Sequence, residues 1–237
     1  MKCPDGSYEL VTGNEVGVLL LDYICAGRIE KGTMPKNPVA VKSIVSTPLA
    51  DEVAEHYGVE LRSVLTGFKW IGDQIAQLEE AGEVDRFIFG FEESYGCLIG
   101  TYARDKDAIV ATMALCEAAA YYKTQGKTLW DAMIEMYEQF GYYKDAIQSV
   151  TMKGIEGLQK IQEIMNSLRQ NPPKEFAGHK VVAVRDYKAD TITDVATGAV
   201  KPTGLPNSNV LYYELTDDAW VCVRPSGTEP KVKFYYG

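Results

Sequence analysis

The chain has little histidine, no cysteine pairing motif and no long apolar run. Its two histidines, His56 and His179, argue against a histidine-based metal cluster. Its five cysteines are scattered and contain no C-x-x-C pair, so we expect reduced thiols rather than a disulfide framework or a zinc site. No apolar stretch approaches the roughly 20 residues that span a bilayer, and the first residues do not form the apolar core of a signal peptide. We therefore expect a cytoplasmic protein without a membrane partner.

Several catalytic and binding motifs are also missing. The sequence contains neither G-x-x-x-x-G-K-[ST] nor G-x-G-x-x-G, which argues against a P-loop enzyme and a Rossmann dehydrogenase. Ser94 has no G-x-S-x-G setting, so a serine hydrolase triad has no support. The net charge of −9 argues against a nucleic-acid partner, because such a surface needs a basic patch.

The apolar pattern that is present predicts an α/β domain. With 237 residues, 46% of them hydrophobic, the chain can bury a sizeable core. After a Gly- and Pro-rich connector, the apolar period switches repeatedly between about 2 and 3.6, as in successive βα units with a largely parallel sheet. The predicted strands are residues 39–45, 59–64 and 87–89, and the predicted helices between them are residues 49–57 and 70–80.

Further helices flank this alternation. Residues 7–14 suggest one edge strand leading into a turn, and a helix is predicted at residues 15–23. Amphipathic stripes, which we interpret as ordinary packing faces, predict three more helices at residues 107–125, 129–140 and 155–168. Thr128 is the expected N-cap of the second of these, with Asp131 three residues further on.

A proline pair suggests where a second domain begins. Pro172 and Pro173 end the last helix, and we place a domain boundary at Asn171. The remainder reads as strands at residues 180–187, 210–215, 219–223 and 231–236, with residues 216–218 as a hairpin turn. The predicted fold class is therefore a three-layer α/β domain with a mixed, mostly parallel sheet, followed by a smaller α+β domain.

The polar loop at residues 224–230 (RPSGTEP) has a composition that suits a phosphate. Arg224 offers a forked cationic donor set, Ser226 and Thr228 offer hydroxyls, and Gly227 lets the backbone approach an anion. Pro, Ser, Gly and Thr are also common in plain hairpin loops. Composition alone therefore does not distinguish a phosphate-binding loop from a structural hairpin loop.

A second polar loop, residues 90–96 (GFEESYG), follows the predicted strand that ends at residue 89. Ligands bind at this edge of parallel sheets, and carboxylates accept hydrogen bonds from sugar hydroxyls. A glycosidase carboxylate pair is the rival reading, but adjacent residues of an extended segment point to opposite faces, which argues against Glu92 and Glu93 flanking one bond. A solvated acidic turn is the other alternative.

Two lysines follow the same edge of the predicted sheet. Lys69 lies in residues 66–72 (TGFKWIG), and Lys106 precedes a long helix whose amino end favours anions. Lys69 suits contact with a ligand at this edge, and Lys106 suits phosphate contact or proton transfer. On these residues alone, a solvated lysine at a helix start is the simpler explanation of each position.

Taken in this order, these segments resemble the phosphoglucomutase and phosphomannomutase family, the α-D-phosphohexomutases. Residues 224–230 resemble the family's phosphate-binding loop and residues 90–96 its sugar-recognition loop. Residues 66–72 resemble the loop that helps orient the sugar in the third domain, and residues 104–107 the segment after it. The resemblance covers essentially the whole chain.

The resemblance implies a four-domain enzyme of which this chain is the C-terminal half. Family members interconvert the 1- and 6-phosphates of a hexose through a bisphosphorylated sugar, with a phosphoserine in domain one and Mg²⁺ on an aspartate-rich loop in domain two. Neither a T-A-S-H-N-P-like segment nor a D-x-D-x-D-R loop is present here. We therefore expect residues 1–12 to be a remnant of the metal-loop domain, residues 13–171 to be domain three, and residues 174–237 to be a C-terminally truncated domain four.

The resemblance also implies cofactors and partners. Mg²⁺ and glucose 1,6-bisphosphate are expected for the full-length enzyme, with no metal ligand among the residues of this chain. The expected partners are a small phosphosugar and the missing domains one and two of the same protein.

Residue roles carry over from the matching motifs. Glu92, Ser94 and Lys69 are expected to contact the sugar, and Lys106 to transfer a proton or contact a phosphate. A clamp on the phosphate that is not being transferred is expected from the residues of the last loop, namely Arg224, Ser226, Gly227 and Thr228. The E-E-S-Y-G form resembles phosphoglucomutases, so glucose phosphates are preferred over mannose phosphates. The alternatives are a stand-alone phosphosugar-binding module without catalysis and a plain α/β protein whose loops are only turns.

Overall fold

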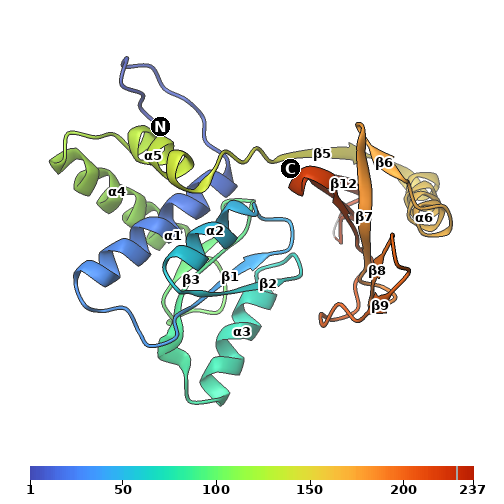
Figure 1. Ribbon diagram of the computed structural model, residues 1–237, viewed down its shortest axis with the longest axis horizontal. Coiled ribbons are helices and arrows are strands. Elements are labelled where there is room, and N and C mark those ends of the chain that lie inside the picture. The colour runs from blue at the N-terminus through green and yellow to red at the C-terminus, as the bar shows by residue number, and fades with distance from the viewer. Residues whose placement is uncertain (228) are drawn as a thin grey trace. The chain divides into compact units, whose positions relative to one another are not determined.

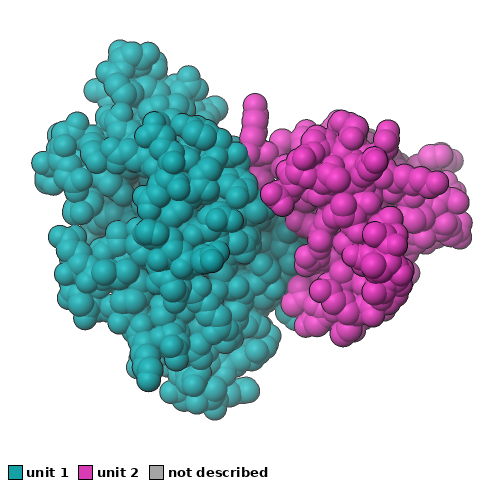
Figure 2. Space-filling view, viewed as in Figure 1, with its two compact units in different colours: residues 1–143 teal, residues 144–237 magenta. Residues whose placement is uncertain are grey.

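Figure 1 shows the computed structural model of the chain, which describes residues 1–227 and 229–237. The chain forms two compact units, Met1–Tyr143 and Lys144–Gly237, which are coloured separately in Figure 2. Residues 1–12 group with the first unit.

The first unit is built on a four-stranded sheet in the order β2-β1-β3-β4. Its strands are β1 (Val39–Ser43), β2 (Glu60–Val64), β3 (Phe87–Phe91) and β4 (Cys97–Ile99). β1 pairs in parallel with β2 and β3, whereas β4 is antiparallel to β3. The predicted mixed, mostly parallel sheet is confirmed. β4 was not predicted, because three residues are too few to show an alternation of apolar and polar residues.

Helices cover both faces of this sheet and make the predicted three layers (Figure 1). One face packs against four helices, α1 (Gly13–Glu30), α2 (Leu49–His56), α4 (Ala108–Thr124) and α5 (Leu129–Phe140). The other face packs against α3 (Lys69–Glu80). β1 alternates between the two cores, with Ala40 in the first and Val39 and Val41 in the second. No helix in the described part of the chain is both long and apolar enough to cross a membrane.

The amino end of the chain differs from the prediction. Residues 7–14 do not form an edge strand; an isolated antiparallel bridge joins Lys2 to Tyr8, and α1 already begins at Gly13. The reason is a capping box, in which Thr12 Oγ1 accepts from Glu15 N and the Glu15 carboxylate accepts from Thr12 N. These contacts satisfy amide groups at the start of the helix and favour helix over strand. The same motif, predicted at Thr128, is confirmed for α5.

The second unit is an antiparallel sheet with one helix packed on it. Its path runs β5-β12-β11-β10-β7-β8-β9, and β6 pairs with β7. The elements are β5 (Ala146–Thr151), α6 (Gly154–Gln170), β6 (Glu175–Phe176), β7 (His179–Asp186), β8 (Thr191–Asp194), β9 (Val200–Lys201), β10 (Leu211–Leu215), β11 (Trp220–Pro225) and β12 (Lys231–Tyr236). Ile161 and Met165 of α6 lie in the core of this sheet. The predicted α+β character of the second domain is confirmed.

The division between the units lies before β5, earlier in the chain than the boundary predicted at Asn171. The prolines after Asn171 do follow the end of α6 at Gln170. However, α6 packs on the second sheet, and β5 pairs with β12 at its edge. The proline pair therefore marks the end of a helix inside the second unit.

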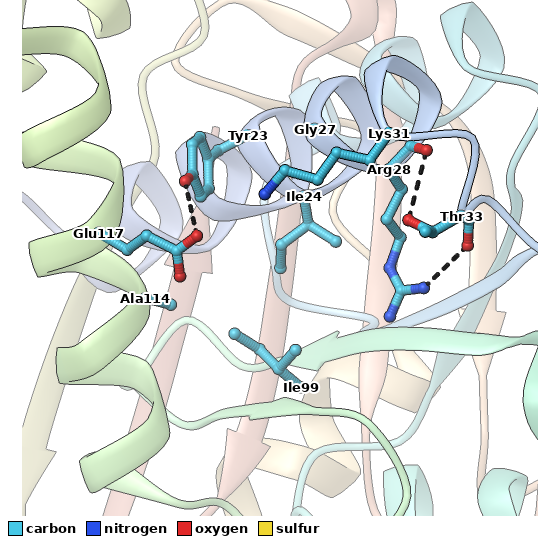
Figure 3. Close-up of a pocket in the computed structure, with 9 residues that line it drawn as sticks. All are labelled: Tyr23, Ile24, Gly27, Arg28, Lys31, Thr33, Ile99, Ala114 and Glu117. Carbon is cyan, nitrogen blue, oxygen red and sulfur yellow. Dashed lines mark hydrogen bonds between the residues drawn. The ribbon is translucent and has the colours of Figure 1, made fainter. Parts of the chain in front are cut away.

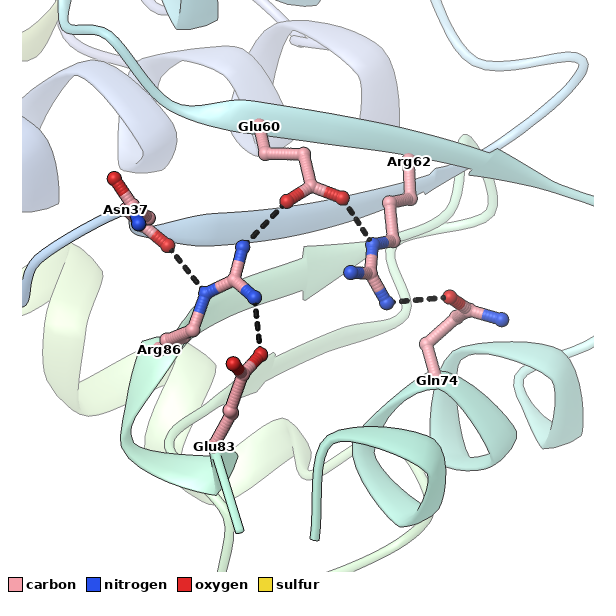
Figure 4. A network of polar contacts seen from close by, with 6 residues as sticks. All are labelled: Asn37, Glu60, Arg62, Gln74, Glu83 and Arg86. Atoms are coloured by element: carbon pink, nitrogen blue, oxygen red, sulfur yellow. Dashed lines mark hydrogen bonds and ion pairs between the residues drawn. The ribbon is translucent and has the colours of Figure 1, made fainter. Parts of the chain in front are cut away.

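An ion-pair network holds the amino ends of the parallel strands together (Figure 4). The Glu60 carboxylate accepts from Arg62 Nε at 2.7 Å and from Arg86 Nη2 at 2.5 Å. Arg86 also donates to Asn37 O at 2.7 Å and pairs with Glu83. The hydrogen bond from Arg62 is the main cause that lowers the pKa of Glu60. This network lies at the opposite end of the parallel strands from the loops that follow their carboxyl ends.

Candidate functional site

The carboxyl ends of β1, β2 and β3 meet at one edge of the first sheet. They lead into residues 44–48, residues 65–68 and residues 92–96, respectively. We call residues 92–96 the carboxylate loop. In open α/β sheets this edge is where ligands bind, because the loops there leave polar groups free of the sheet ladder.

Glu92 is a buried carboxylate that joins two of these loops. Its residue is 7% exposed, and its Oε1 accepts a hydrogen bond from Gly67 N at 2.7 Å. Glu92 N donates to Gly96 O at 2.8 Å, which closes the carboxylate loop between β3 and β4. Glu92 Oε2 has no hydrogen-bond partner among residues 1–227 and 229–237. This oxygen can therefore accept a hydrogen bond from a ligand.

Glu93 turns to a different loop. Its Oε2 accepts from Ser43 Oγ, at the end of β1, at 3.1 Å. The two adjacent carboxylates thus have partners on two different segments, Gly67 after β2 and Ser43 at the end of β1. Ser94 lies between them and Tyr95, is exposed, and makes no hydrogen bond to a described residue.

The start of α1 packs closely against the backbone of the carboxylate loop. A Cβ atom added at Gly13 would lie 2.1 Å from Glu93 O and 2.6 Å from Tyr95 N, so only glycine allows this close approach. Tyr95 adopts a left-handed conformation with φ of 66°. Its hydroxyl donates to Val11 O at 2.8 Å. These contacts hold the loop to the segment that enters α1.

Both lysines predicted as site residues lie at this edge. A Cβ atom added at Gly96 would lie 3.1 Å from Lys106 Cδ, so the Lys106 stem lies against the carboxylate loop. Lys106 Nζ lies 5.7 Å from the ring centre of Phe68 and 3.3 Å from Asp105 Oδ1. Lys69 is the first residue of α3, and its Nζ lies 4.7 Å from the ring centre of Trp70.

The segment before α4 keeps its carboxylates ionised beside Lys106. The pKa of Asp107 is lowered by hydrogen bonds from the Tyr102 hydroxyl and from two amide groups at the start of α4. The same bond raises the pKa of Tyr102 to about 12. A hydrogen bond from Lys106 N lowers the pKa of Asp105. Both carboxylates are therefore stabilised in their ionised form by hydrogen bonds within this segment.

The sequence analysis missed a group of buried polar residues beneath the site. They are 8% exposed or less: Asn14, Lys42, Ser43, Ser46 and Thr47. Four of them belong to one stretch, KSIVST, which comprises the last two residues of β1 and the turn after it. Polar residues just after a buried parallel strand were the available signal, since that position is the ligand edge of the sheet.

Three of the predicted phosphate-binding residues are described in the second unit: Arg224 lies near the end of β11, and Ser226 and Gly227 follow that strand. We call residues 224–230 the Arg224 loop. Ser226 N donates to Lys231 O at 2.8 Å, which closes the turn, and Gly227 is exposed. Arg224 forms no ion pair with any other residue that the structure describes. Thr228 lies outside the described residues.

Metal ligands do not gather in the described part of the chain. Among residues 1–227 and 229–237, no three His, Cys, Asp or Glu side chains come together as a metal ion would require. The five cysteines are free, and burial raises the pKa of Cys97 to about 12.

A pocket of about 300 Å³ lies between the end of α1 and α4 (Figure 3), and none of the predicted site residues line it. Its polar groups largely serve the helices: Tyr23 OH donates to Glu117 Oε1 at 3.2 Å. Arg28 Nη1 donates to Thr33 O at 3.2 Å, just beyond the end of α1. This arrangement fixes a helix end, where a cation is favoured by the helix dipole.

Family comparison assigns both units. Residues 12–140 match the model of phosphoglucomutase/phosphomannomutase α/β/α domain III. Residues 164–237 match the model of the phosphoglucomutase/phosphomannomutase C-terminal domain.

Curated relatives and solved structures agree with this assignment. Phosphoglucomutase from Staphylococcus aureus strain bovine RF122 / ET3-1 is 39% identical over 230 residues, and that of strain MRSA252 is 38% identical. Each alignment covers 97% of this chain but 40% of the relative, so the chain spans about 40% of their length.

Two solved structures share the fold. The open form of pp63/parafusin, a phosphoglucomutase from Paramecium, has a TM-score of 0.64 at 20% identity and is aligned over 98% of this chain and 37% of its own. A phosphoglucomutase/phosphomannomutase family protein from Burkholderia thailandensis has a TM-score of 0.52 at 14% identity, over 96% and 38%. Since the domain III model alone matches more than half of the residues, the chain belongs to the phosphoglucomutase/phosphomannomutase family.

Proposed function

We propose that this chain supplies sugar and phosphate recognition to a phosphohexose mutase, which interconverts hexose 1-phosphate and hexose 6-phosphate through a bisphosphorylated intermediate. The observation that carries the proposal is Glu92, a buried carboxylate at the ligand edge of the sheet. One of its oxygens is fixed by Gly67 N, and the other is left to accept a hydrogen bond. A sugar hydroxyl is the complementary donor.

The neighbouring groups suit the rest of a phosphosugar. Ser94 is exposed on the carboxylate loop and can both donate to and accept from a hydroxyl. Lys106 and Lys69 provide cations at the same edge, which favour a phosphate. We assign Lys106 to phosphate contact or proton transfer, and Lys69 to substrate contact.

The Arg224 loop is proposed to hold the phosphate that is not being transferred. Arg224 has the forked donor geometry that matches phosphate oxygens, and Ser226, Gly227 and Thr228 complete the clamp by the family resemblance. A bisphosphate intermediate must turn end for end between two transfers. One site must therefore grip either phosphate, while the carboxylate loop accepts the sugar in either orientation.

Phosphoryl transfer itself is assigned to the rest of a longer protein. The family's phosphoserine and Mg²⁺ loop belong to domains one and two, and this chain matches domain III and the C-terminal domain. Such transfer depends on a metal and a positioned phosphoryl group. We therefore propose that the chain alone has no turnover, and that Mg²⁺ and glucose 1,6-bisphosphate serve the full-length enzyme in the cytoplasm.

Glucose phosphates are the proposed substrates. The carboxylate loop has the E-E-S-Y form, which resembles phosphoglucomutases, and the curated relatives above carry that name. A mannose preference would be shown by tighter binding of mannose 1,6-bisphosphate than of the glucose compound.

Calorimetric titration of the 237-residue chain with glucose 1,6-bisphosphate tests the proposal. Arg224→Ala should weaken binding about 10- to 100-fold, since a hydrogen bond to a charged group contributes about 1.5–3 kcal/mol. Lys201→Ala is the matched control, because it removes one positive charge from an exposed position of the same unit. Equal affinities for the wild type and Arg224→Ala would overturn the phosphate assignment.

A further inference from the structure

We propose that Ser43 is a positioning residue for the carboxylate loop, acting through Glu93. The inference rests on the proposed function, because it explains how the loop that carries Glu92 and Ser94 is held in place for a sugar. It assigns to Ser43 a role that neither the motifs nor the family resemblance gave it, and it makes Glu93 an anchor rather than a ligand contact.

Ser43 and Ser46 form a directed chain of hydrogen bonds that ends on Glu93. Ser43 is fully buried, and its Oγ lies 3.1 Å from Glu93 Oε2 and 2.9 Å from Ser46 Oγ. A hydroxyl has one proton to donate, and an ionised carboxylate only accepts. Since Ser43 gives its proton to Glu93, Ser46 must donate to Ser43.

The base of this chain is itself fixed. Ser46 N donates to Ser43 O at 3.0 Å, which closes the turn after β1. The next residue, Thr47, donates its amide to Asn14 Oδ1 at 3.1 Å and accepts at its carbonyl from Lys42 Nζ at 3.1 Å. The turn is therefore tied to β1 and to the start of α1, and all five residues are buried. Ser43 presents its hydroxyl from a rigid support.

Two adjacent carboxylates consequently tie the carboxylate loop to two other segments. Glu92 is held by Gly67 in the loop after β2, and Glu93 by Ser43 at the end of β1. With both held, the backbone between them has little freedom, and the direction of the next residue, Ser94, follows. Loss of the bond from Ser43 removes the direct link between Glu93 and the end of β1.

Hydrogen exchange of the backbone amides of residues 92–96, measured on the ligand-free 237-residue chain, tests the inference directly. Ser43→Ala should speed exchange of these amides about tenfold, as expected for loss of a hydrogen bond to a charged group. Ser46→Ala is the matched control: it removes a buried hydroxyl from the same chain but leaves the bond between Ser43 and Glu93. Equal exchange in the two variants would overturn the proposal.

Variants of Glu93 approach the same bond from its other end. Glu93→Ala should speed exchange at least as much as Ser43→Ala, and adding Ser43→Ala to it should give no further increase, because the bond between the two residues is already lost. Glu93→Gln keeps an oxygen that accepts from Ser43 and should retain protection. This series decides the question even if Ser43→Ala does not fold. Additive effects of Ser43→Ala and Glu93→Ala would contradict the proposal.

Titration of the same variants with glucose 1,6-bisphosphate separates this inference from the proposed function. We expect about tenfold weaker binding by Ser43→Ala and wild-type affinity for Ser46→Ala. A wild-type chain that does not bind would overturn the proposed function, while the exchange data still decide whether Ser43 holds the loop. A loosened loop with unchanged affinity would overturn the claim that its position serves sugar recognition.

Discussion

The carboxylate loop and the Arg224 loop are built in different ways. In the carboxylate loop, Glu92, Glu93 and Tyr95 are each bonded to a separate neighbouring segment. The Arg224 loop connects β11 and β12, which are neighbours in the chain and in the sheet. In that loop, a Cβ atom added at Gly227 would have no neighbouring atom within 4 Å.

The two loops depend on the rest of the fold to different extents. The carboxylate loop lies at the end of parallel strands, where segments distant in sequence converge and can supply partners. The Arg224 loop is a local hairpin connection whose backbone closes on itself through Ser226 and Lys231. We therefore expect mutations in and beneath the carboxylate loop to affect stability, and mutations in the Arg224 loop to affect mainly anion binding.

Gly13→Ala should cause the largest decrease in the free energy of unfolding. The added Cβ would lie 2.1 Å from the backbone oxygen of Glu93, so the carboxylate loop or α1 must move. Overpacking of this kind costs about 3 kcal/mol at the upper end of its usual range. The free energy of unfolding, measured by urea denaturation, checks this.

Gly27→Ala is the control for the same helix and the same substitution. An added Cβ at Gly27 meets no atom within 4 Å, so alanine should raise the free energy of unfolding by up to about 1 kcal/mol. A destabilisation by Gly13→Ala no greater than that of Gly27→Ala would show that the loop does not depend on this close approach.

Glu92→Ala should have the next largest effect. It removes the acceptor of Gly67 N from a position that is 7% exposed, and an unsatisfied buried donor costs about 2 kcal/mol. Glu229→Ala makes the same substitution in the Arg224 loop, where the Glu229 side chain is 52% exposed and pairs with Lys231. Its effect on the free energy of unfolding should stay below about 1 kcal/mol. Similar losses in both variants would remove the contrast between the loops.

Gly227→Ala should affect ligand binding rather than stability. Because its Cβ enters open space, we expect a change within about 0.5 kcal/mol in the free energy of unfolding. Affinity for glucose 1,6-bisphosphate should nevertheless fall, since a side chain would hinder backbone approach to a phosphate. Calorimetry and urea denaturation of one preparation report both quantities. Unchanged affinity would place the anion away from Gly227.

The smallest expected effect is a pH dependence at the border of the carboxylate-loop site. The folded-state pKa of Asp107 is lowered, chiefly by the Tyr102 hydroxyl, so its stabilising contribution is present above the unfolded pKa of about 3.9 and is lost as pH falls through the folded value. Asp107→Asn should therefore flatten the acid side of the stability profile. It should also bring the pKa of Tyr102 down from about 12, which alkaline absorbance titration measures. Identical profiles for both proteins would contradict this assignment.

The sequence predicts the elements better than it predicts their contacts. The alternating periods located the helices and the parallel strands because burial on a sheet or helix face imposes those periods. β4 escaped because of its length, and the start of α1 was misplaced because the capping box of Thr12 lies in a stretch with strand-like alternation.

The candidate site was predictable only where a residue carries recognisable chemistry. Glu92, Lys106 and Lys69 were placed at one sheet edge from the order of strands and loops, and the structure has them there. Ser43 was not found, because a serine after a strand is common and its importance depends on Glu93, which lies 50 residues further along the chain. Contacts of that kind arise from the tertiary fold and leave no local pattern.

The way β4 follows the carboxylate loop limits how this site can diversify. Phe91 pairs with Cys97, and along β4 the side chain of Cys97 enters the core on the α1 face, whereas Leu98 enters the core beneath α3. A residue inserted in the loop must either lift it away from Gly67 and Ser43 or slide β4 by one position and exchange the two faces. The chemistry of the carboxylate loop can thus be altered by exchanging its side chains, whereas a change in its length disturbs the core on both faces of the sheet.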